Sequence, residues 1–357
     1  MPGIVGDLRE VAVPPEIGAI ADIAPVRRGD KPLWLVLDVE GGIHRWHTGT
    51  GRTRRRASTT VPAEPEHRAW AGRGRRRHLH ATQDGRYAAV VNDYGTFGEV
   101  VDLRSGLPTM TLDNHGYHQD TVPFSLAFTE RDGRPVVIHR TDWNRLDASD
   151  AATGALLTAR GPTDLRHGGE RPEHYLDYFH GALYLSPDGR RILDDGWVWQ
   201  PYGVPVVWDV DKWLAGDVWE SEDGASLRCL CVRDDWDRPV VWLDADRVAV
   251  GGLGEDAGDM HPGVRVFDTA LDAPRTGRMA GCVETISFEG PDGPLFCRGA
   301  LLFASAPTGL TVWDPQDGTL LVTVPGYSPA HLHPATGEFA ELVDDGRRLR
   351  LWRPPGG

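Results

Sequence analysis

The chain has 357 residues, a net charge of −14 at pH 7 and a sequence pI of about 5.4. Hydrophobic residues make up 40% and charged residues 25%, proportions that exclude an intrinsically disordered chain. The acidic balance disfavours nucleic acid and anionic membrane surfaces as partners.

The sequence also carries no sign of a membrane or secretory segment. No stretch approaches 18 consecutive apolar residues, and the N-terminal segment has no basic region followed by an apolar one. We therefore expect no membrane partner and a cytoplasmic location. The four cysteines lack the paired spacing of a zinc site, so we expect buried free thiols.

In chain order, a strand is predicted first over Asp7–Val13. After it, a short apolar segment that usually ends in Asp recurs at intervals of 39 to 59 residues. The copies are IHRWH at Ile43–His47, EVVD at Glu99–Asp102, LDASD at Leu146–Asp150, PVVWD at Pro205–Asp209, VRVFD at Val264–Asp268, LTVWD at Leu310–Asp314 and LRLWR at Leu349–Arg353. The spacing predicts one structural unit for each copy.

Tight turns flank these segments. A turn dipeptide ending in Gly precedes five of them, and such dipeptides favour hairpins because Gly accepts a positive φ. The five are Asp84-Gly85, Asp132-Gly133, Asp188-Gly189, Asp292-Gly293 and Thr336-Gly337. Together with the β-rich runs between them, they predict four antiparallel strands in each unit.

Seven units of four strands predict an all-β, seven-bladed β-propeller that occupies residues 1–357 as one domain. The aromatic residues before Asp, such as Trp208 and Trp313, should fill the space between blades. The last unit ends after its third strand at Leu349–Arg353. We expect residues 7–13 to supply its fourth strand and so close the ring.

The Trp-Asp dipeptides and the turn spacing resemble the WD40 family of propellers, and its divergent bacterial members in particular. Trp208-Asp209 and Trp313-Asp314 match the family dipeptide, and the likeness covers nearly the whole chain. The resemblance implies a rigid scaffold that binds partners on its faces, usually without catalysis.

Unusual residues gather in loops on one face, which we call the top face. It carries the loops from second to third strands and from one blade to the next. The longest predicted loops are Asn92–Gly98, Asp113–Pro123, His139–Arg145, Arg166–Gly181, Asp194–Gly203 and Gly251–Gly263. Long loops on a rigid scaffold commonly carry function.

Carboxylates are the first candidate group on the top face. Asp93, Asp142 and Asp195 each lie near the end of a predicted second strand, so a ring fold would bring them together as an acidic arc. Converging carboxylates would hold a divalent cation or the cationic end of a ligand. Asp is also a favoured turn residue, which leaves a purely structural role open. No cofactor other than such a cation is expected.

Histidines and aromatic residues complete the candidate site. His78 with His80 and His331 with His333 lie on predicted innermost strands. When the units are aligned by their turns, the two pairs lie on opposite faces of their strands, which argues against a metal site shared by the two pairs. Loop residues are better candidates. The predicted ligand-binding residues are Asp93, Tyr94, His118, Asp142, Trp143, Asn144, His174, Tyr178, His180, Asp195 and Trp197.

Two functions are compatible with this site. The first is a binding scaffold that recognises a protein segment or a small ligand on the top face. The alternative is an enzyme at the channel mouth, a metal-assisted lyase or hydrolase. In that enzyme, Asp142 and Asp195 would hold the ion and His118 or His180 would act as general base.

Overall fold

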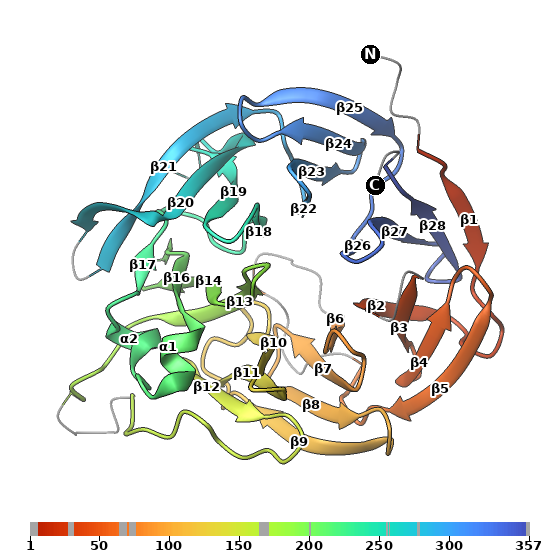
Figure 1. The fold of residues 1–357 in the computed structure, drawn as a ribbon, viewed down its shortest axis with the longest axis horizontal. Coiled ribbons are helices and arrows are strands. Elements are labelled where there is room, and N and C mark those ends of the chain that lie inside the picture. Colours follow the sequence, from red (N-terminus) through yellow and green to blue (C-terminus); the bar gives the residue numbers. More distant parts are fainter. Residues whose placement is uncertain are drawn as a thin grey trace.

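In the computed structural model, antiparallel sheets form a ring around a central axis (Figure 1). The structure describes residues 6–27, 32–63, 70, 76–163, 171–199, 201–254, 256, 258–276 and 279–354. The ring arrangement is that of a β-propeller, as the repeat predicted.

Four of the sheets contain four strands each. The first is β2 (Ile20–Val26), β3 (Leu33–Asp38), β4 (Gly42–His47) and β5 (Arg52–Ser58). The second is β6 (Arg76–Ala81), β7 (Tyr87–Asp93), β8 (Phe97–Asp102) and β9 (Leu107–Asp113). The third is β22 (Leu295–Arg298), β23 (Leu301–Ala306), β24 (Gly309–Asp314) and β25 (Thr319–Pro325). The fourth is β26 (His331–His333), β27 (Glu338–Val343), β28 (Arg348–Trp352) and β1 (Arg9–Ala12).

The remaining strands form a three-stranded and a nine-stranded sheet. The smaller is β10 (Leu126–Arg131), β11 (Arg134–Asp142) and β12 (Arg145–Asp150). The larger holds β13 (Phe179–Leu185), β14 (Arg191–Val198), β15 (Tyr202–Gly203), β16 (Val206–Asp209), β17 (Arg228–Cys229), β18 (Val240–Trp242), β19 (Arg247–Leu253), β20 (His261–Thr276) and β21 (Met279–Glu289). A short parallel pairing of β17 with β21 joins its two antiparallel halves.

Two short helices, α1 (Val210–Ala215) and α2 (Glu220–Asp223), lie between β16 and β17. Asp209, the last residue of a recurring segment, caps α1 because its side chain accepts a hydrogen bond from the Lys212 amide at 2.9 Å. In the described part of the chain, neither these helices nor any other is long and apolar enough to cross a membrane.

Each recurring segment forms the third strand of a sheet or of one half of the nine-stranded sheet. In the three-stranded sheet no fourth strand follows among the described residues, so the predicted count of four strands is wrong for this unit. The segments become β4, β8, β12, β16, β20, β24 and β28. Their aromatic residues are buried, including Trp208 and Trp313, which confirms the packing role predicted for these two residues. Between β6 and β7, Gly85 has a φ of 64°, as the turn requires. One predicted turn is placed differently: Asp292-Gly293 precedes β22, and Gly299 makes the turn from β22 to β23.

The two ends of the chain meet in one sheet. β1 pairs with β28 in antiparallel register, with Arg9 opposite Leu351 and Ala12 opposite Arg348. This is the pairing expected between residues 7–13 and the last recurring segment. The first strands of successive units contact one another around the centre: β2 with β6, β6 with β10, β10 with β13, β13 with β18, β18 with β22, and β26 with β2.

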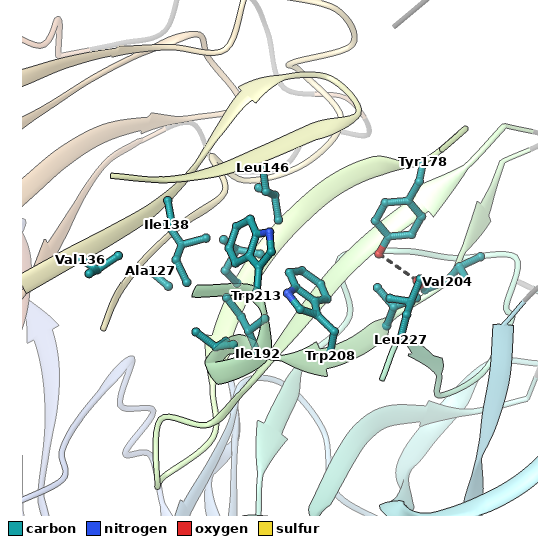
Figure 2. Packing of buried hydrophobic residues seen from close by; sticks show 14 of the residues in the cluster. Ala127, Val136, Ile138, Leu146, Tyr178, Ile192, Val204, Trp208, Trp213 and Leu227 are labelled. Carbon is teal, nitrogen blue, oxygen red and sulfur yellow. Dashed lines mark hydrogen bonds between the residues drawn. The ribbon is translucent and has the colours of Figure 1, made fainter. Parts of the chain in front are cut away.

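Separate hydrophobic clusters fill the space between neighbouring sheets. Figure 2 shows the cluster in which Trp208 of β16 and Trp213 of α1 pack with Ile138 of β11 and Leu146 of β12. Because this cluster draws residues from two sheets, neither sheet has to bury that face alone. The cysteines are free as expected, although Cys297 is only partly buried.

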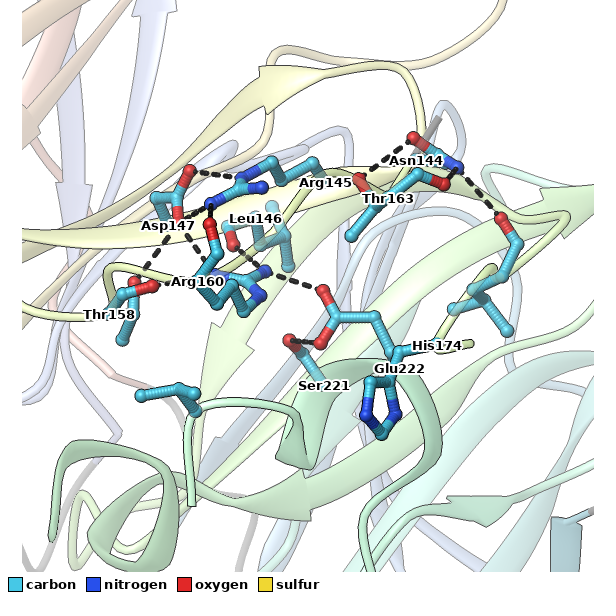
Figure 3. Close-up of polar contacts among 12 residues, drawn as sticks. Asn144, Arg145, Leu146, Asp147, Thr158, Arg160, Thr163, His174, Ser221 and Glu222 are labelled. Atoms are coloured by element: carbon cyan, nitrogen blue, oxygen red, sulfur yellow. Dashed lines mark hydrogen bonds and ion pairs between the residues drawn. The ribbon is translucent and has the colours of Figure 1, made fainter. Parts of the chain in front are cut away.

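An irregular segment takes the place of a fourth strand beside β12. Leu157 donates its amide to the Ala148 carbonyl at 2.8 Å, and Thr158 Oγ1 accepts from the Ala148 amide at 3.0 Å. Arg160 then turns inward and pairs with Asp147 of β12 and Glu222 of α2 (Figure 3). A buried ion pair therefore fastens this sheet to the helical insertion of the next unit.

Candidate functional site

Strands extend further into the top face than the sequence predicted. β11 runs to Asp142, so Trp143 and Asn144 alone connect it to β12. β14 runs to Val198 through much of the segment predicted as a loop over Asp194–Gly203. The loop predicted over Arg166–Gly181 begins outside the described residues. Side chains in these strand extensions alternate between buried faces, and this alternation changes the role of several predicted site residues.

Asp93, the last residue of β7, is buried among donors. Its Oδ2 lies 3.1 Å from His78 Nδ1 and 3.3 Å from Arg76 Nε, and its Oδ1 accepts from the Phe124 amide at 3.2 Å. Burial favours the neutral acid, but His78 and Arg76 outweigh it and lower the pKa of Asp93 to about 2. The Asp93 carboxylate therefore already accepts hydrogen bonds from residues of its own sheet and from a residue just before the next sheet.

The other two acids of the predicted arc, Asp195 and Asp142, have different partners. Asp195 pairs with Arg233 Nη2 at 3.0 Å, and both side chains are buried. Asp142 Oδ1 accepts a hydrogen bond from the Trp143 amide at 2.7 Å. Among the described residues, no group of three or more His, Cys, Asp or Glu is placed to hold a metal ion. The described residues therefore do not bring the three acids together as the expected arc.

Tyr178, His180 and Asn144 are predicted site residues that the structure buries. His180 Nδ1 lies 2.6 Å from Asp194 Oδ2, and Tyr178 Oη lies 3.0 Å from the Val204 carbonyl oxygen. Burial raises the pKa of Tyr178 well above its usual value. Asn144 donates from Nδ2 to the carbonyl oxygens of Thr163 and Leu176 at 2.8 and 3.0 Å. These three side chains fix the top-face loops.

Tyr94 and His174 lie apart from each other in local contacts of their own. Tyr94 donates its hydroxyl to Asp237, and its φ of 61° places it in the left-handed region. His174 Nδ1 lies 2.9 Å from Asp223, and its ring stacks on Trp219 at 4.1 Å between centroids. His174 therefore belongs to the surface around α2.

The remaining predicted residues, His118, Trp143 and Trp197, meet in a group of rings that we call the aromatic cluster. The cluster comprises Trp70, Tyr117, His118, Trp143, Phe179, Trp197, Trp199 and Trp236. These rings come from six separate loops or strand ends. The sequence analysis named three of them as ligand-binding residues.

Four of the rings form a continuous stack. Trp70 lies on Trp236 at 4.7 Å between centroids, Trp236 on Trp197 at 5.3 Å, and Trp197 on Phe179 at 4.1 Å. The interplanar angles are 23°, 19° and 10°. Tyr117 continues the stack beyond Phe179 at 5.8 Å and 24°. Stacked rings restrain one another, so the cluster is a stiff surface.

The stack is buried at its centre and exposed at its ends. Phe179, Trp197 and Trp236 are buried, and Trp236 Nε1 donates to the Thr121 carbonyl at 3.0 Å. In contrast, Trp70 is 47%, Tyr117 53% and Trp199 58% exposed. Large exposed aromatic area on a rigid base is unusual for a surface that meets only water.

Five rings of the cluster were not among the predicted ligand-binding residues: Trp70, Tyr117, Phe179, Trp199 and Trp236. Phe179 lies in the predicted loop beside two residues that were selected, and Trp236 lies in an Asp-rich stretch before β18. The available signal was the presence of an aromatic residue near the top end of each unit. Which rings would stack depends on contacts between residues up to 166 positions apart, as in Trp70 and Trp236.

The innermost strands hold a second polar group. His78 Nε2 on β6 and His331 Nε2 on β26 lie 3.8 and 3.4 Å from the two carboxylate oxygens of Asp22 on β2. Burial lowers the pKa of His331 to about 4 and that of His80 to about 3. The two strands carry their histidines to one shared acid, a link between sheets that alignment by turns did not predict.

Comparison with known proteins finds a similar fold but no similar sequence. No family model and no curated protein matches the sequence. Among solved structures, a chain of the "Crystal Structure of Mitotic Checkpoint Complex" matches with a TM-score of 0.56 at 14% identity, over 98% of this chain and 94% of that chain. The fold is a β-propeller. At this identity the likeness concerns the fold alone.

Proposed function

We propose that this propeller has seven blades and works as an interaction scaffold that binds a protein segment at its aromatic cluster. The blade count rests on the division of the nine-stranded sheet. Its halves, β13–β14–β16–β17 and β18–β19–β20–β21, each repeat the order of the four-stranded sheets. Together with the five other sheets they make seven units.

The observation that carries the binding proposal is the set of half-exposed rings on a stacked, buried base. Trp and Tyr are enriched among the residues that dominate protein interfaces, because they bring large area with little conformational freedom to lose. Trp199 and Tyr117 both contact His118, at 5.2 and 4.6 Å between centroids. The exposed rings therefore belong to one surface.

Charge favours a partner segment that carries Arg or Lys. The chain has a net charge of −14. At the edge of the cluster, Arg171 already lies over the Tyr175 ring at 4.4 Å, and Tyr175 is 6.3 Å from Trp143. Burial and then the charge of the exposed Asp177 raise the pKa of Tyr175, so negative charge lies beside these rings. Aromatic faces next to carboxylates would attract a cation of the partner, as the Tyr175 ring attracts Arg171.

The geometry does not support the enzyme alternative. Asp195 is neutralised by Arg233, and His180 is fully buried against Asp194. Neither can hold an ion or take a proton from a substrate at the surface. His118, the other histidine considered as a base, packs on Phe179 and Trp197.

The test is selection from a library of short displayed peptides on the wild-type protein, followed by affinity measurements on variants. Trp199→Ala with Tyr117→Ala should weaken the selected peptides by about 30-fold or more, the loss typical of interface hot spots. Leu107→Ala is the matched control because Leu107 is 64% exposed on the outer strand β9. The selected peptides should contain Arg or Lys.

Two results would contradict the proposal. One is a failure to enrich any peptide on the wild-type protein. The other is enrichment of peptides whose affinity is the same for the double variant and for Leu107→Ala. Equal unfolding midpoints of the variants would show that any loss of binding comes from the removed rings.

A further inference from the structure

A pocket of about 280 Å³ lies between the first two sheets and is lined almost entirely by arginines. Its lining residues are Arg45, Arg56, Asp84, Arg86 and Arg104. The pocket lies at the turns from β6 to β7 and from β8 to β9, whereas the loop that carries Tyr117 bonds to the turn from β7 to β8. The pocket is therefore at the opposite strand ends from the aromatic cluster.

The first sheet contributes two arginines that reach across to the second. Arg45 of β4 donates from Nη2 to the Gly85 carbonyl, and Arg56 of β5 donates from Nε to the Leu103 carbonyl at 2.9 Å. The neutral Leu103 carbonyl oxygen fixes the Arg56 guanidinium group without cancelling its charge. Both side chains are partly buried, so their positive charge is held in place at the pocket wall.

The second sheet contributes two exposed arginines. The Arg86 and Arg104 backbone amides are fixed by Asp84 Oδ1 at 2.9 Å and Asp102 Oδ1 at 2.7 Å. Within the described part of the chain, their guanidinium groups form no hydrogen bond or ion pair, and Arg86 lies only over the Tyr87 ring at 5.0 Å. Their donors are available to a ligand.

The charge of the pocket is opposite in sign to the net charge of the chain. Among the described lining residues, four are arginines and one, Asp84, is an acid, so this part of the lining is positive although the protein carries a net charge of −14. Asp84 Oδ1 is already occupied by Thr82 Oγ1 at 2.7 Å and by the Arg86 amide. Clustered arginines repel one another, and an anion bound between them removes that repulsion.

We propose that this pocket binds a phosphate dianion, either free or as a small phosphate monoester. Guanidinium groups match phosphate oxygens with paired, charge-assisted hydrogen bonds. The volume lies just below the range of about 300–1,000 Å³ for drug-sized ligands, so a phosphate with a small organic group fits better than a large ligand. The proposal is independent of binding at the aromatic cluster.

The test is calorimetric titration of the full chain with inorganic phosphate and, separately, with phenyl phosphate. Arg86→Gln with Arg104→Gln should weaken binding of both probes by about tenfold or more, because charge-assisted hydrogen bonds are lost. Arg52→Gln with Arg54→Gln is the matched control: it removes the same charge from exposed positions of β5 outside the pocket. The control should bind as the wild type does.

The two probes also separate the sources of the phosphate group. Tighter binding of phenyl phosphate assigns the pocket to a monoester, and tighter binding of inorganic phosphate assigns it to the free anion. Affinity should fall as the pH drops below about 6, where a monoester takes up a proton while arginine stays charged. Absence of binding of either probe up to about 10 mM, or an equal loss in the control, would overturn the proposal.

Discussion

Arg160 offers the sharpest test of how the helical insertion is held. Its side chain is 0% exposed, its Nη1 lies 2.6 Å from Asp147 Oδ1, and its Nη2 bonds Glu222 of α2 (Figure 3). Nη2 also donates to the Leu146 carbonyl at 2.6 Å. Replacing Arg160 by Met keeps much of the length of the side chain and removes all of these hydrogen bonds and ion pairs.

The cost follows from what Arg160→Met leaves behind. Asp147 keeps Arg145 as a partner at 2.8 Å, but among the described residues Glu222 keeps only the Ser221 hydroxyl at 2.9 Å as a side-chain donor. Breaking a buried ion pair from one side typically costs about 3–5 kcal/mol. With an unfolding entropy of about 2.1 cal/mol/K per residue, this corresponds to a fall of about 4–7 °C in the midpoint for 357 residues.

Urea denaturation at several pH values gives the measurement. Arg145→Met is the control, because Arg145 also pairs with Asp147 but is partly exposed, and its loss should be smaller. In Arg160→Met, the buried Glu222 without its cation favours the neutral acid, so the deficit relative to wild type should narrow as the pH falls from about 7 to 5. Adding Glu222→Gln should recover part of the loss.

The reasoning would be refuted by a loss below about 1 kcal/mol at neutral pH, or by a deficit that does not change with pH. Either result would mean that water reaches the pair and that the insertion is held by its apolar contacts. An equal loss in Arg145→Met would show that Asp147, rather than the link to α2, carries the stability.

Two further predictions concern the core and its pH dependence. Trp208→Ala should lower the free energy of unfolding by about 3–5 kcal/mol in urea, because Trp208 fills the cluster between β11 and β16; an unchanged midpoint would place it at the surface. Burial lowers the pKa of His139 to about 4, so the folded state favours the neutral imidazole. The associated stability should be complete above about pH 6.5 and decline by about 3 kcal/mol as the pH falls towards 4. His139→Gln should flatten this part of the pH profile, and a slope equal to that of wild type would contradict the assignment.

Local chemistry in the sequence was enough to predict the architecture. The recurring segments become strands because their short, β-branched and aromatic apolar runs suit a largely buried strand, and the Asp-Gly dipeptides fix several of the hairpins. The pairing of β1 with β28 followed from a surplus strand at one end and a missing strand at the other. The repeated strands and turns depend on neighbours along the chain, and the pairing of β1 with β28 follows from counting the strands at the two ends.

The candidate sites were decided by the tertiary structure. Asp195 was expected at the mouth of a channel, but β14 continues past it, and Arg233, 38 residues away, meets it in the interior. The arginine pocket combines two strands of one sheet with two turns of the next. Such contacts depend on where each strand ends and which face a side chain takes, and a shift of one residue reverses that face. Local patterns therefore set the repeat, whereas the packing of one sheet against the next sets which charges and rings meet.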